Sequence, residues 1–562
     1  MEKWLICSAW PYVNTIPHLG NIIQLLSADV AARYFRMKGA KVLFVSGSDE
    51  HGTPIEVEAV KRGIKPKELT DINHAKVVEL FNKWNISFDN YTRTENPVHK
   101  EFVRQFYMKL YERGYIFDEE IEMPYCPKCE RFLPDRFIRG TCPHCGFPDA
   151  KGDQCDRCGR LLTPLSLINP RCAICGTRPV IKRTRHWFFD LPKLTKKLFE
   201  YISTNKNLPD NARNMSLQML KEGLKPRSIT RDNKWGIPAP FPGAEGKTIY
   251  VWMEAVLGYV SAVIEYFKVR GMENEWKKFW LDKSTKSAYF IGKDNIPFHT
   301  IIFPALLMAS GEGYVLPWTV ASTEYLLFDG QKFSKSRGIG IWIDEAPELL
   351  PIDYWRFVLI ATRPETKDAN FSWKVLQEVI NTQLNDALGN FVHRTLTFIY
   401  KNFDGRIPTP GEFDEYDKEV LETIKRTAKE VANLLETFRL KFALSKVIDL
   451  SRVGNKYLND KEPWKTIKTR PQLAATTLYV AAQLVKALAV MLYPFVPNSA
   501  LRLLNMLGYD IKREELKWSW SYKPIPSGHQ IKKPEPLFSK LSDEDVKELQ
   551  KKLRELRELR VK

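Results

Sequence analysis

The stretch KWLICSAWPYVNTIPHLGNIIQLL, residues 3–26, decides the fold of the N-terminal part of this chain. Its apolar run from Lys3 to Ala9 predicts a strand, and the apolar-periodic residues that begin at Ile22 predict a helix. A helix N-terminus favours anions, because its first N–H groups are free and its dipole is positive there. Gly20 permits close approach of the backbone, and His18 can hydrogen-bond a phosphate oxygen. The sequence therefore predicts an anion site where the strand enters the helix.

A second segment with phosphate chemistry lies far along the chain, Lys332-Phe333-Ser334-Lys335-Ser336. The residues Asp329-Gly330-Gln331 before it and Arg337-Gly338 after it predict a loop. Its two lysines can neutralise charge that develops on a triphosphate as the α-phosphate is attacked. Either segment alone is weak evidence, but together they supply two halves of one phosphate-handling device.

The bulk composition is that of a large globular protein. A chain of 562 residues is too long for one core and is expected to form three or four domains. No signal peptide precedes the first strand, so we expect a cytoplasmic protein. The apolar stretch 484–496 is interrupted by Lys486 and Pro494, which indicates a buried helix and not a membrane span.

The charge balance favours a polyanionic partner. Lysine and arginine exceed the acidic residues by 18, and the pI is about 9.3. A basic surface steers nucleic acid and supplies the salt-dependent part of its affinity. A heavily charged, heat-adapted surface that leans basic is the alternative interpretation.

Eight of the nine cysteines form four Cys-x-x-Cys pairs: Cys126/Cys129, Cys142/Cys145, Cys155/Cys158 and Cys172/Cys175. Two such pairs supply the thiolates of a tetrahedral zinc site, so four pairs predict two sites. Disulfides are the alternative, but the missing export signal indicates a reducing compartment. Closed four-thiolate sites leave no position for a substrate, so both zinc ions are expected to be structural. The spacing allows sequential pairing, or a nested arrangement in which the inner pairs join and the outer pairs close around them.

The order of elements predicts an α/β parallel-sheet domain interrupted by the cysteine-rich insertion and followed by an all-α domain. A second strand, Lys41 to Ser46, leads into the polar segment Gly47 to Thr53, at the sheet edge where ligands bind. After the insertion the α/β pattern resumes, and from about Ser372 long helical periodicities take over. The predicted divisions are a Rossmann-type domain at 1–116 and 226–325, the insertion at 117–225, a loop region at 326–371, an all-α domain at 372–535 and a tail helix at 536–562.

The two phosphate segments, in this order, resemble the signature sequences of the class I aminoacyl-tRNA synthetases. His18-Leu19-Gly20-Asn21 corresponds to the first signature, with Asn21 where many members have a second histidine. Lys332 to Ser336 corresponds to the second, with Phe333 in place of the usual methionine. Asparagine keeps a hydrogen-bond donor but cannot become cationic, so a charged role at position 21 is excluded.

Within class I, the chain resembles the methionyl-tRNA synthetases over nearly its full length. The segments that carry the resemblance are Ala9-Trp10-Pro11-Tyr12 with Asn14, Ser48 to Thr53, Tyr250 to Ala255 with Gly258-Tyr259, and Phe290 to His299. Asn295-Ile296-Pro297-Phe298-His299 looks like the archaeal and eukaryotic branch. Some relatives keep only the inner four cysteines, which favours nesting: Cys142, Cys145, Cys155 and Cys158 for the first zinc, and Cys126, Cys129, Cys172 and Cys175 for the second.

The resemblance implies a methionine–tRNA ligase that forms methionyl-adenylate from ATP, with Mg²⁺, and passes the acyl group to tRNA(Met), including the initiator. It implies catalytic roles for His18, Asn21, Lys332 and Lys335. For ATP it implies Pro11, Asn14, His18, Gly20, Asn21, Arg231, Asp294 and Lys335. For methionine it implies Ala9, Trp10, Tyr12, Asp49, Trp252, Ala255, Tyr259, Asn295, Phe298, His299 and Phe303. Aromatic rings make favourable contacts with a thioether, and Asp49 can bind the substrate ammonium group.

A second match falls in the all-α part. Asn390 and Arg394 are four residues apart and share a helical face, and Pro463-Trp464 lies on a later turn. Arginine and asparagine can read base edges, and an indole can stack on an unpaired base. The resemblance implies that Asn390, Arg394 and Trp464 read the anticodon.

Two other functions are compatible with parts of the pattern. A small-molecule adenylyltransferase shares a similar His-x-Gly-His device but does not need the helices that carry Asn390, Arg394 and Trp464. A zinc-bearing RNA-binding protein with an inactive nucleotide fold would not need His18, Lys332 and Lys335. The tail 541–562 carries an apolar stripe that packs on the body or on a partner, and we expect a monomer that binds no membrane.

Overall fold

The computed structural model describes residues 2–152, 155, 157, 158, 160, 162–334 and 337–561. Its centre is a parallel sheet with the strand order β14-β13-β1-β2-β3. The strands are β1 (Lys3–Ser8), β2 (Lys41–Ser48), β3 (Asn90–Arg93), β13 (Thr285–Gly292) and β14 (Thr319–Thr323). The order runs outward in both directions from β1, so a crevice for ligands is expected beside the carboxyl end of β1.

Both faces of the sheet are buried, because successive side chains of a strand point to opposite sides. Trp4 and Ile6 lie in one core, which also contains residues of α1 (Leu19–Lys38), α3 (Pro66–Lys83) and α12 (Ile352–Ala361). Leu5 and Cys7 lie in the other, with α4 (Pro97–Glu112), α8 (Gly258–Lys268) and α10 (Phe303–Ser310). Cys7 is fully buried, as expected of a small core residue.

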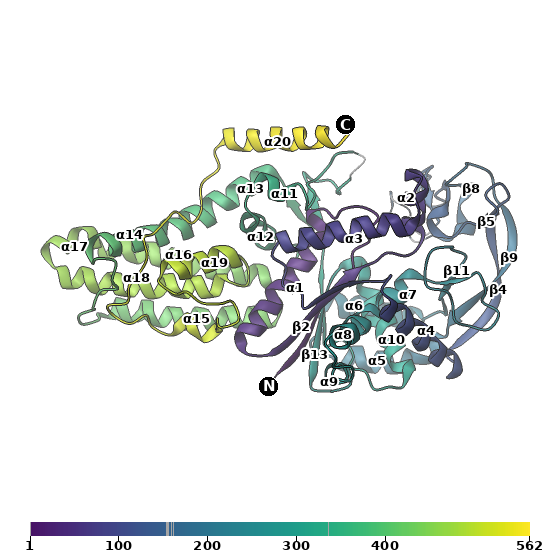
Figure 1. Ribbon diagram of the computed structural model, residues 1–562, viewed down its shortest axis with the longest axis horizontal. Helices are drawn as coiled ribbons and strands as arrows, with labels where there is room; N and C mark the ends of the chain where they lie inside the picture. Colours follow the sequence, from purple (N-terminus) through teal and green to yellow (C-terminus); the bar gives the residue numbers. More distant parts are fainter. Residues whose placement is uncertain are drawn as a thin grey trace.

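The cysteine-rich insertion leaves the sheet as a long antiparallel ladder, at the right of Figure 1. It pairs β4 (Ile116–Cys126) with β9 (Val180–Phe189). Between them lie β5 (Arg131–Phe132), β6 (Ile138–Thr141), β7 (Ala150–Lys151) and β8 (Ile168–Cys172). The chain returns to the sheet through α5 (Thr195–Thr204), α6 (Asp210–Glu222), β10 (Arg227–Ser228), β11 (Thr230–Arg231), β12 (Thr248–Ile249), α7 (Val251–Ala255) and, after α8, α9 (Lys277–Trp280).

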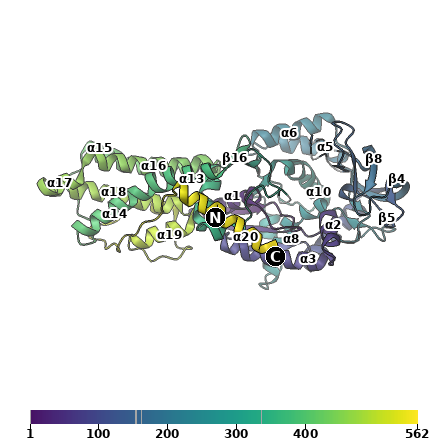
Figure 2. The ribbon, with the colours of Figure 1, turned by 90° about the horizontal axis from the view of Figure 1, so that it is seen from above.

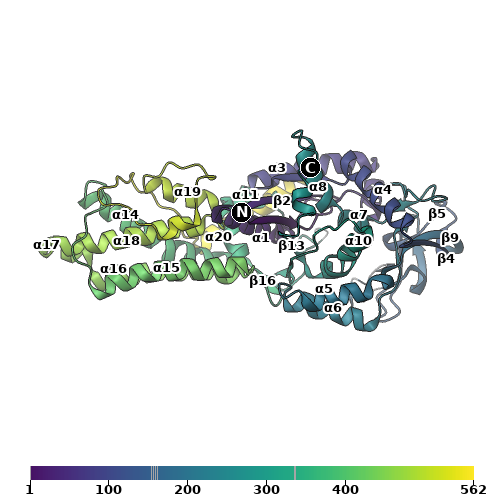
Figure 3. The same cartoon turned by 90° about the horizontal axis from the view of Figure 1, so that it is seen from below.

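The loop that carries Lys332 follows β15 (Leu326–Phe328) and precedes α11 (Ala346–Leu349). β15 pairs in parallel with β16 (Ala369–Phe371), which leads into the helical domain. That domain extends to the left in Figures 1 and 3. Its helices are α13 (Trp373–Val379), a π-helical segment (Ile380–Gly389), α14 (Asn390–Asn402), α15 (Glu415–Glu436), α16 (Leu440–Lys461), α17 (Pro463–Thr469), α18 (Pro471–Leu492) and α19 (Pro497–Met506).

Two sequence expectations for the helical part have clear outcomes. Among the described residues, α18 is the one helix that is long and apolar enough to cross a membrane, and 94% of its most apolar window is buried. The stretch is therefore a core helix, as predicted. The long helical periodicities expected from about Ser372 are helices in the structure, and one of them, α15, ends at Glu436 before α16 begins at Leu440.

The tail forms α20 (Asp543–Val561) and packs back on the body. Leu549 and Leu553, on its apolar stripe, are buried in the core that includes α1 and the helical domain. Figure 2 shows α20 lying across the junction between the helical domain and the sheet domain. Of the two alternatives for the tail, the structure supports packing on the chain itself.

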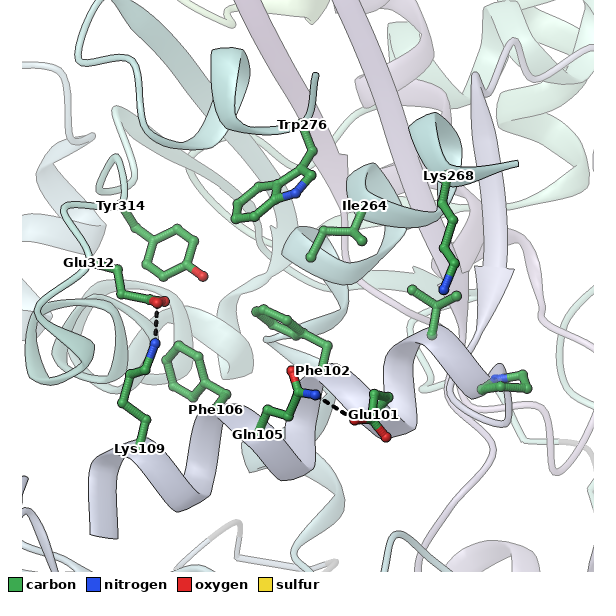
Figure 4. Close-up of a pocket in the computed structure, with 12 residues that line it drawn as sticks. Glu101, Phe102, Gln105, Phe106, Lys109, Ile264, Lys268, Trp276, Glu312 and Tyr314 are labelled. Carbon is green, nitrogen blue, oxygen red and sulfur yellow. Dashed lines mark hydrogen bonds and ion pairs between the residues drawn. The ribbon is translucent and has the colours of Figure 1, made fainter. Parts of the chain in front are cut away.

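An open groove of about 710 Å³ lies on the side of the sheet domain covered by α4 and α8 (Figure 4). Phe102, Phe106, Trp276 and Tyr314 line it, and the ion pair between Lys109 and Glu312 lies at one end. None of the residues predicted to bind ATP or methionine lines this groove.

Candidate functional site

His18 and Asn21 cap the N-terminus of α1. The ring Nδ1 of His18 accepts a hydrogen bond from the backbone N–H of Gly20 at 3.1 Å, and Oδ1 of Asn21 accepts one from the backbone N–H of His18 at 3.1 Å. Burial lowers the pKa of His18 to about 4, so the ring is neutral at pH 7. Because Nδ1 is an acceptor, Nε2 carries the proton and is a hydrogen-bond donor. Gly20 has little room for a side chain, since a Cβ there would lie 3.1 Å from the His18 ring.

The two phosphate segments meet in space. The rings of His18 and Phe333 are stacked, with centroids 4.3 Å apart and planes inclined by 6°. The Lys332 ammonium group lies 4.9 Å from the centre of the Tyr325 ring, and the Tyr325 hydroxyl donates to both carboxylate oxygens of Asp294. Lys332 and Asp294 are thus neighbours through Tyr325. Lys335 lies outside the described residues.

Aromatic side chains form two layers beside the carboxyl ends of the strands. In the first layer, the Trp252 indole N–H donates to the Tyr12 hydroxyl. The Trp252 ring makes an edge contact with the Phe298 ring, with ring centroids 4.8 Å apart. The second layer is more deeply buried and contains Tyr259, His299 and Phe303. Ala255, half-buried at the end of α7, and Asn295, half-buried after β13, lie close to these residues along the chain.

Both ring nitrogens of His299 are already bonded. Nδ1 donates to the Asn295 carbonyl at 2.9 Å, so Nε2 is the acceptor of the Tyr259 hydroxyl at 2.8 Å. Burial lowers the pKa of His299 to about 4, which keeps the ring neutral. His299 therefore shapes the pocket wall by holding Tyr259, and it has no free N–H for a ligand.

Trp10 lies between two glycines. A Cβ at Gly47 or at Gly258 would lie 2.6 Å or 2.5 Å from the indole ring, so both positions exclude a side chain while Trp10 stays in place. Ala9 continues β1 by donating its N–H to the Phe290 carbonyl at 2.9 Å. The indole therefore packs the end of β2 against the start of α8.

Asp49 has the most unusual environment of the predicted residues. Tyr12 and Asp49 form a parallel bridge beyond the ends of β1 and β2, and the Pro11 carbonyl accepts from the Asp49 N–H at 2.9 Å. Asp49 is 3% exposed, and its Oδ1 accepts no hydrogen bond within the described part of the chain. Burial and the nearby Glu254 carboxylate raise the pKa of Asp49 well above its usual range. A buried carboxylate with an open acceptor suits a cationic ligand.

His51 is a site residue that the sequence analysis did not assign. Its two ring nitrogens bind the carboxylates of Glu254 and Glu95, the latter at 2.7 Å. Burial alone would lower the pKa of His51, but these carboxylates raise it to about 10. The ring is therefore cationic and links β2 to α7. The signal was present in the sequence, because His51 lies two residues after Asp49 and Glu254 lies in a quoted segment.

Two further predicted ATP residues, Arg231 and Asn14, lie in segments outside the central sheet. The Arg231 guanidinium on β11 is 3.9 Å from the centre of the Tyr250 ring. Asn14 is half-buried in the segment between β1 and α1. Both therefore belong to segments that flank Tyr12 and α7.

The eight paired cysteines form two groups in the nested arrangement. Cys126, Cys129, Cys172 and Cys175 form one cluster, and Cys142, Cys145, Cys155 and Cys158 form the other; within each, all sulfur atoms lie within 4.8 Å of one another. The shortest contacts between pairs are 3.5–3.9 Å. Tetrahedral zinc with Zn–S bonds of about 2.3 Å requires sulfur atoms about 3.8 Å apart. Both clusters are thus consistent with zinc sites.

Arg394 and Trp464 come together at the far end of the helical domain. The Arg394 guanidinium lies 5.0 Å from the Trp464 ring and donates to Oδ1 of Asn459 at 3.0 Å. A groove of about 280 Å³ between α14 and α17 is lined by both residues. Asn390 is exposed one turn earlier on α14, and Trp464 is 37% exposed. The groove therefore offers a guanidinium and an indole face to solvent, and the exposed Asn390 amide lies one helical turn before Arg394.

Comparisons with known proteins agree over almost the whole chain. A family model described as "tRNA synthetases class I (M)" matches residues 4–396, and one described as "Anticodon binding domain of methionyl tRNA ligase" matches residues 407–558. The chain belongs to the methionine–tRNA ligases of class I. A methionine–tRNA ligase of Thermofilum pendens is 57% identical over 99% of this chain and 98% of the relative. One of Korarchaeum cryptofilum is 55% identical over 97% of this chain and 96% of the relative.

A solved structure has the same fold. The crystal structure of Mycobacterium tuberculosis methionyl-tRNA synthetase bound by methionyl-adenylate matches with a TM-score of 0.79 and 25% identity. The match covers 96% of this chain and 100% of that chain. The predicted fold class and activity are confirmed: this is an ATP-dependent methionine–tRNA ligase with a parallel-sheet catalytic domain and a helical anticodon-binding domain. The adenylyltransferase and inactive RNA-binding alternatives are excluded.

Proposed function

We propose that the edge of the sheet beside α1 forms methionyl-adenylate with the residues named above. The methionine carboxylate attacks the α-phosphate of ATP, a P–O bond forms, and pyrophosphate leaves. The Nε2–H of His18 and the amide of Asn21 donate to the phosphate in the transition state, while Lys332 and Lys335 neutralise the β,γ end. The stacking of His18 on Phe333 carries this assignment, because it joins the helix N-terminus to the lysine-bearing loop.

Further residues and a metal ion complete the ATP-binding site. Pro11, Asn14, Gly20, Arg231 and Asp294 line the nucleotide. Mg²⁺ enters with ATP and offsets the negative charge of its phosphates. No nucleophilic side chain is needed, because positioning and charge neutralisation supply the catalysis.

Methionine binds with its ammonium group on Asp49. The cation supplies the partner that Oδ1 lacks, and its charge returns the Asp49 carboxyl to the ionised form despite burial. The thioether lies against Tyr12, Trp252 and Phe298, because sulfur packs favourably at aromatic rings. Ala9, Trp10, Ala255, Tyr259, Asn295, His299 and Phe303 complete the shape of this pocket.

The second step passes the acyl group to tRNA(Met), including the initiator. The 3′-terminal ribose hydroxyl attacks the acyl carbon, loses its proton and releases AMP. Asn390, Arg394 and Trp464 read the anticodon at the other end of the molecule. Each cysteine cluster holds one structural Zn²⁺, which keeps the insertion folded. The enzyme acts as a monomer in the cytoplasm.

Methionine-dependent exchange of pyrophosphate into ATP tests the adenylation residues. Lys332→Ala, Lys335→Ala and His18→Ala should each reduce the exchange rate by about 10²–10³-fold, because each removes a group that contacts the transition state. Methionine affinity, measured by tryptophan fluorescence without ATP, should change less than about twofold. Lys374→Ala, which removes an exposed lysine on α13, is the control. An unchanged exchange rate in the loop variants would remove the lysines from the mechanism.

A further inference from the structure

The last turns of α20 hold the loop that carries Lys332. The Arg557 guanidinium donates to the carbonyl oxygens of Gly338 at 3.0 Å and Gly340 at 2.7 Å. It also binds both carboxylate oxygens of Glu345, at 2.7 and 2.8 Å, and lies 5.3 Å from the centre of the Trp342 ring. The Arg557 side chain therefore binds two backbone carbonyls and one buried carboxylate.

Gly338 and Gly340, which Arg557 binds, belong to the part of the loop that follows Ser334. Ser334 and Ile339 exchange two backbone hydrogen bonds of 2.9 Å, so Gly338 and Gly340 lie on the returning arm of a hairpin. A Cβ at Gly340 would lie 2.2 Å from the ring of Phe333. Phe333 in turn stacks on His18. Arg557 thus acts on the arm directly behind the aromatic contact that joins the two phosphate segments.

The returning arm continues alongside the start of α1. The Leu19 N–H donates to the Ile341 carbonyl, and the Ile343 N–H donates to the Pro17 carbonyl, both at 3.0 Å. The Trp342 ring makes an edge contact with His18 at 6.3 Å. Residues 341–343 are therefore fixed to α1, while Gly338 and Gly340 depend on Arg557 for their partners among the described side chains.

The other end of α20 is anchored on the helical domain. The Leu541 N–H donates to the Asn381 side chain at 2.8 Å, and its carbonyl accepts from the Asn381 and Gln377 side chains at 2.8 and 3.2 Å. Leu549 and Leu553 are buried along the way. The helix therefore reaches the loop from a fixed base, and it crosses the junction between the domains (Figure 2).

We propose that α20 is a strut for the catalytic loop and that Arg557 is a positioning residue for adenylate formation. The inference rests on the proposed role of the loop lysines. Arginine suits this task because its rigid fork can donate to several acceptors at once. Without it, the hairpin loses its outer support and the lysines spend less time at the ATP phosphates, although the methionine pocket keeps all its contacts.

Pyrophosphate exchange with separate titrations of ATP and methionine tests the strut. Arg557→Ala should reduce kcat/KM for ATP by about 10–100-fold, as a displaced catalytic group does, with methionine affinity unchanged within about twofold. Arg557→Lys keeps the charge beside Glu345 but loses the fork, so it should recover part of the loss. Arg554→Ala removes the same charge from an exposed position on the same helix and should match the wild type.

Each outcome decides between the strut and its alternatives. Normal exchange in Arg557→Ala, with Lys332→Ala and Lys335→Ala inactive, would overturn the strut alone. Normal exchange in all three would overturn the proposed lysine roles and the strut with them. An equal loss of methionine and ATP binding would show general damage and contradict a positioning role. If Arg557→Ala does not fold, wild-type kinetics in Arg557→Lys would overturn the proposal.

Discussion

The imidazole of His18 lies flat against the phenyl ring of Phe333, with centroids 4.3 Å apart. His18 is the N-cap of α1, and Phe333 lies in a loop that follows the insertion in the sequence. The contact joins the loop to the helix N-terminus, and Nε2 of His18 has no hydrogen-bond partner among the residues that the structure describes. Stacked aromatic pairs contribute about 0.5–1.5 kcal/mol beyond the area that they bury.

Phe333→Ala should therefore slow adenylate formation. The loss of about 1 kcal/mol of loop closure corresponds to a reduction of about 3–10-fold in exchange at low ATP. Phe333→Met should stay within about twofold of the wild type, because a thioether also packs well on an aromatic ring. Equal loss in both variants would mean that the loop is held by contacts other than this stack.

The cationic state of His51 predicts a pH dependence of stability. Its pKa is about 10 in the folded chain and about 6.5 in an unfolded one, so it stabilises the fold fully below pH 6.5 and loses this contribution as the pH rises towards 10. The gap in unfolding free energy between wild type and His51→Gln should shrink by about 1 kcal/mol per pH unit inside this window. Urea unfolding at pH 6.5, 8 and 9.5 measures it.

His74 provides the control for that experiment. Burial lowers the pKa of His74 to about 4, so this ring is neutral in both states above pH 7. The gap between wild type and His74→Gln should not change from pH 7 to pH 9.5. A constant gap for His51→Gln as well would show that His51 is neutral between its two glutamates.

A buried charge cluster joins the catalytic and helical domains. Asp29 on α1 accepts from Arg33 at 2.8 Å and from Arg356 on α12 at 2.6 Å, and Arg356 also donates to the Phe495 carbonyl after α18 at 2.9 Å. Asp29→Ala should destabilise the fold by about 3–5 kcal/mol, because it leaves two buried guanidinium groups without their carboxylate. Asp386→Ala, which breaks an exposed pair with Lys540, should cost less than about 1 kcal/mol. Denaturant unfolding compares them.

The nested clusters predict which cysteine pairs lose zinc together. Metal analysis of the purified enzyme should find two zinc ions per chain. Cys142→Ser with Cys158→Ser should leave one, since both residues belong to one cluster. Cys126→Ser with Cys142→Ser should leave none, because each cluster then lacks a ligand. One remaining zinc in the last variant would contradict the nested arrangement.

The groove at α14 and α17 predicts a tRNA-specific defect. Arg394→Ala should raise KM for tRNA by about 10–100-fold, the usual cost of a lost bidentate base contact. Pyrophosphate exchange without tRNA should be unchanged, because the groove lies between α14 and α17, towards the left end of the helical domain in Figure 1, and the adenylation residues belong to the sheet domain. Arg452→Ala, on the exposed face of α16, is the control. A defect in pyrophosphate exchange would show that Arg394 stabilises the fold and does not act in tRNA recognition.

Local patterns predicted much of this protein. The run from Lys3 to Ile23 predicted a strand that leads into an anion-favouring helix, and β1 and α1 have that order. The Cys-x-x-Cys spacing predicted two four-thiolate clusters before any contact was known. Both features depend on neighbours within a few residues, so periodicity and spacing report them directly.

Other features depend on residues that are distant in the chain. His51 and Glu254 are 203 positions apart, and Arg557 lies 212 positions after Glu345. Charge and aromaticity in the sequence say that such groups exist, but not which of them meet. Burial then sets their ionisation, as the opposite pKa shifts of His18 and His51 show.

The sequence by itself determined the family, the order of the domains and the residue types of the site, because signatures and periodicity are local properties of the chain. Only the tertiary structure decided that Phe333 covers His18 and that the tail helix returns to the catalytic loop, and it agrees with the nested cysteine arrangement that the cysteine spacing alone had left open. Each of these is a contact between segments that packing brings together, and the free energy of such a contact depends on the whole fold.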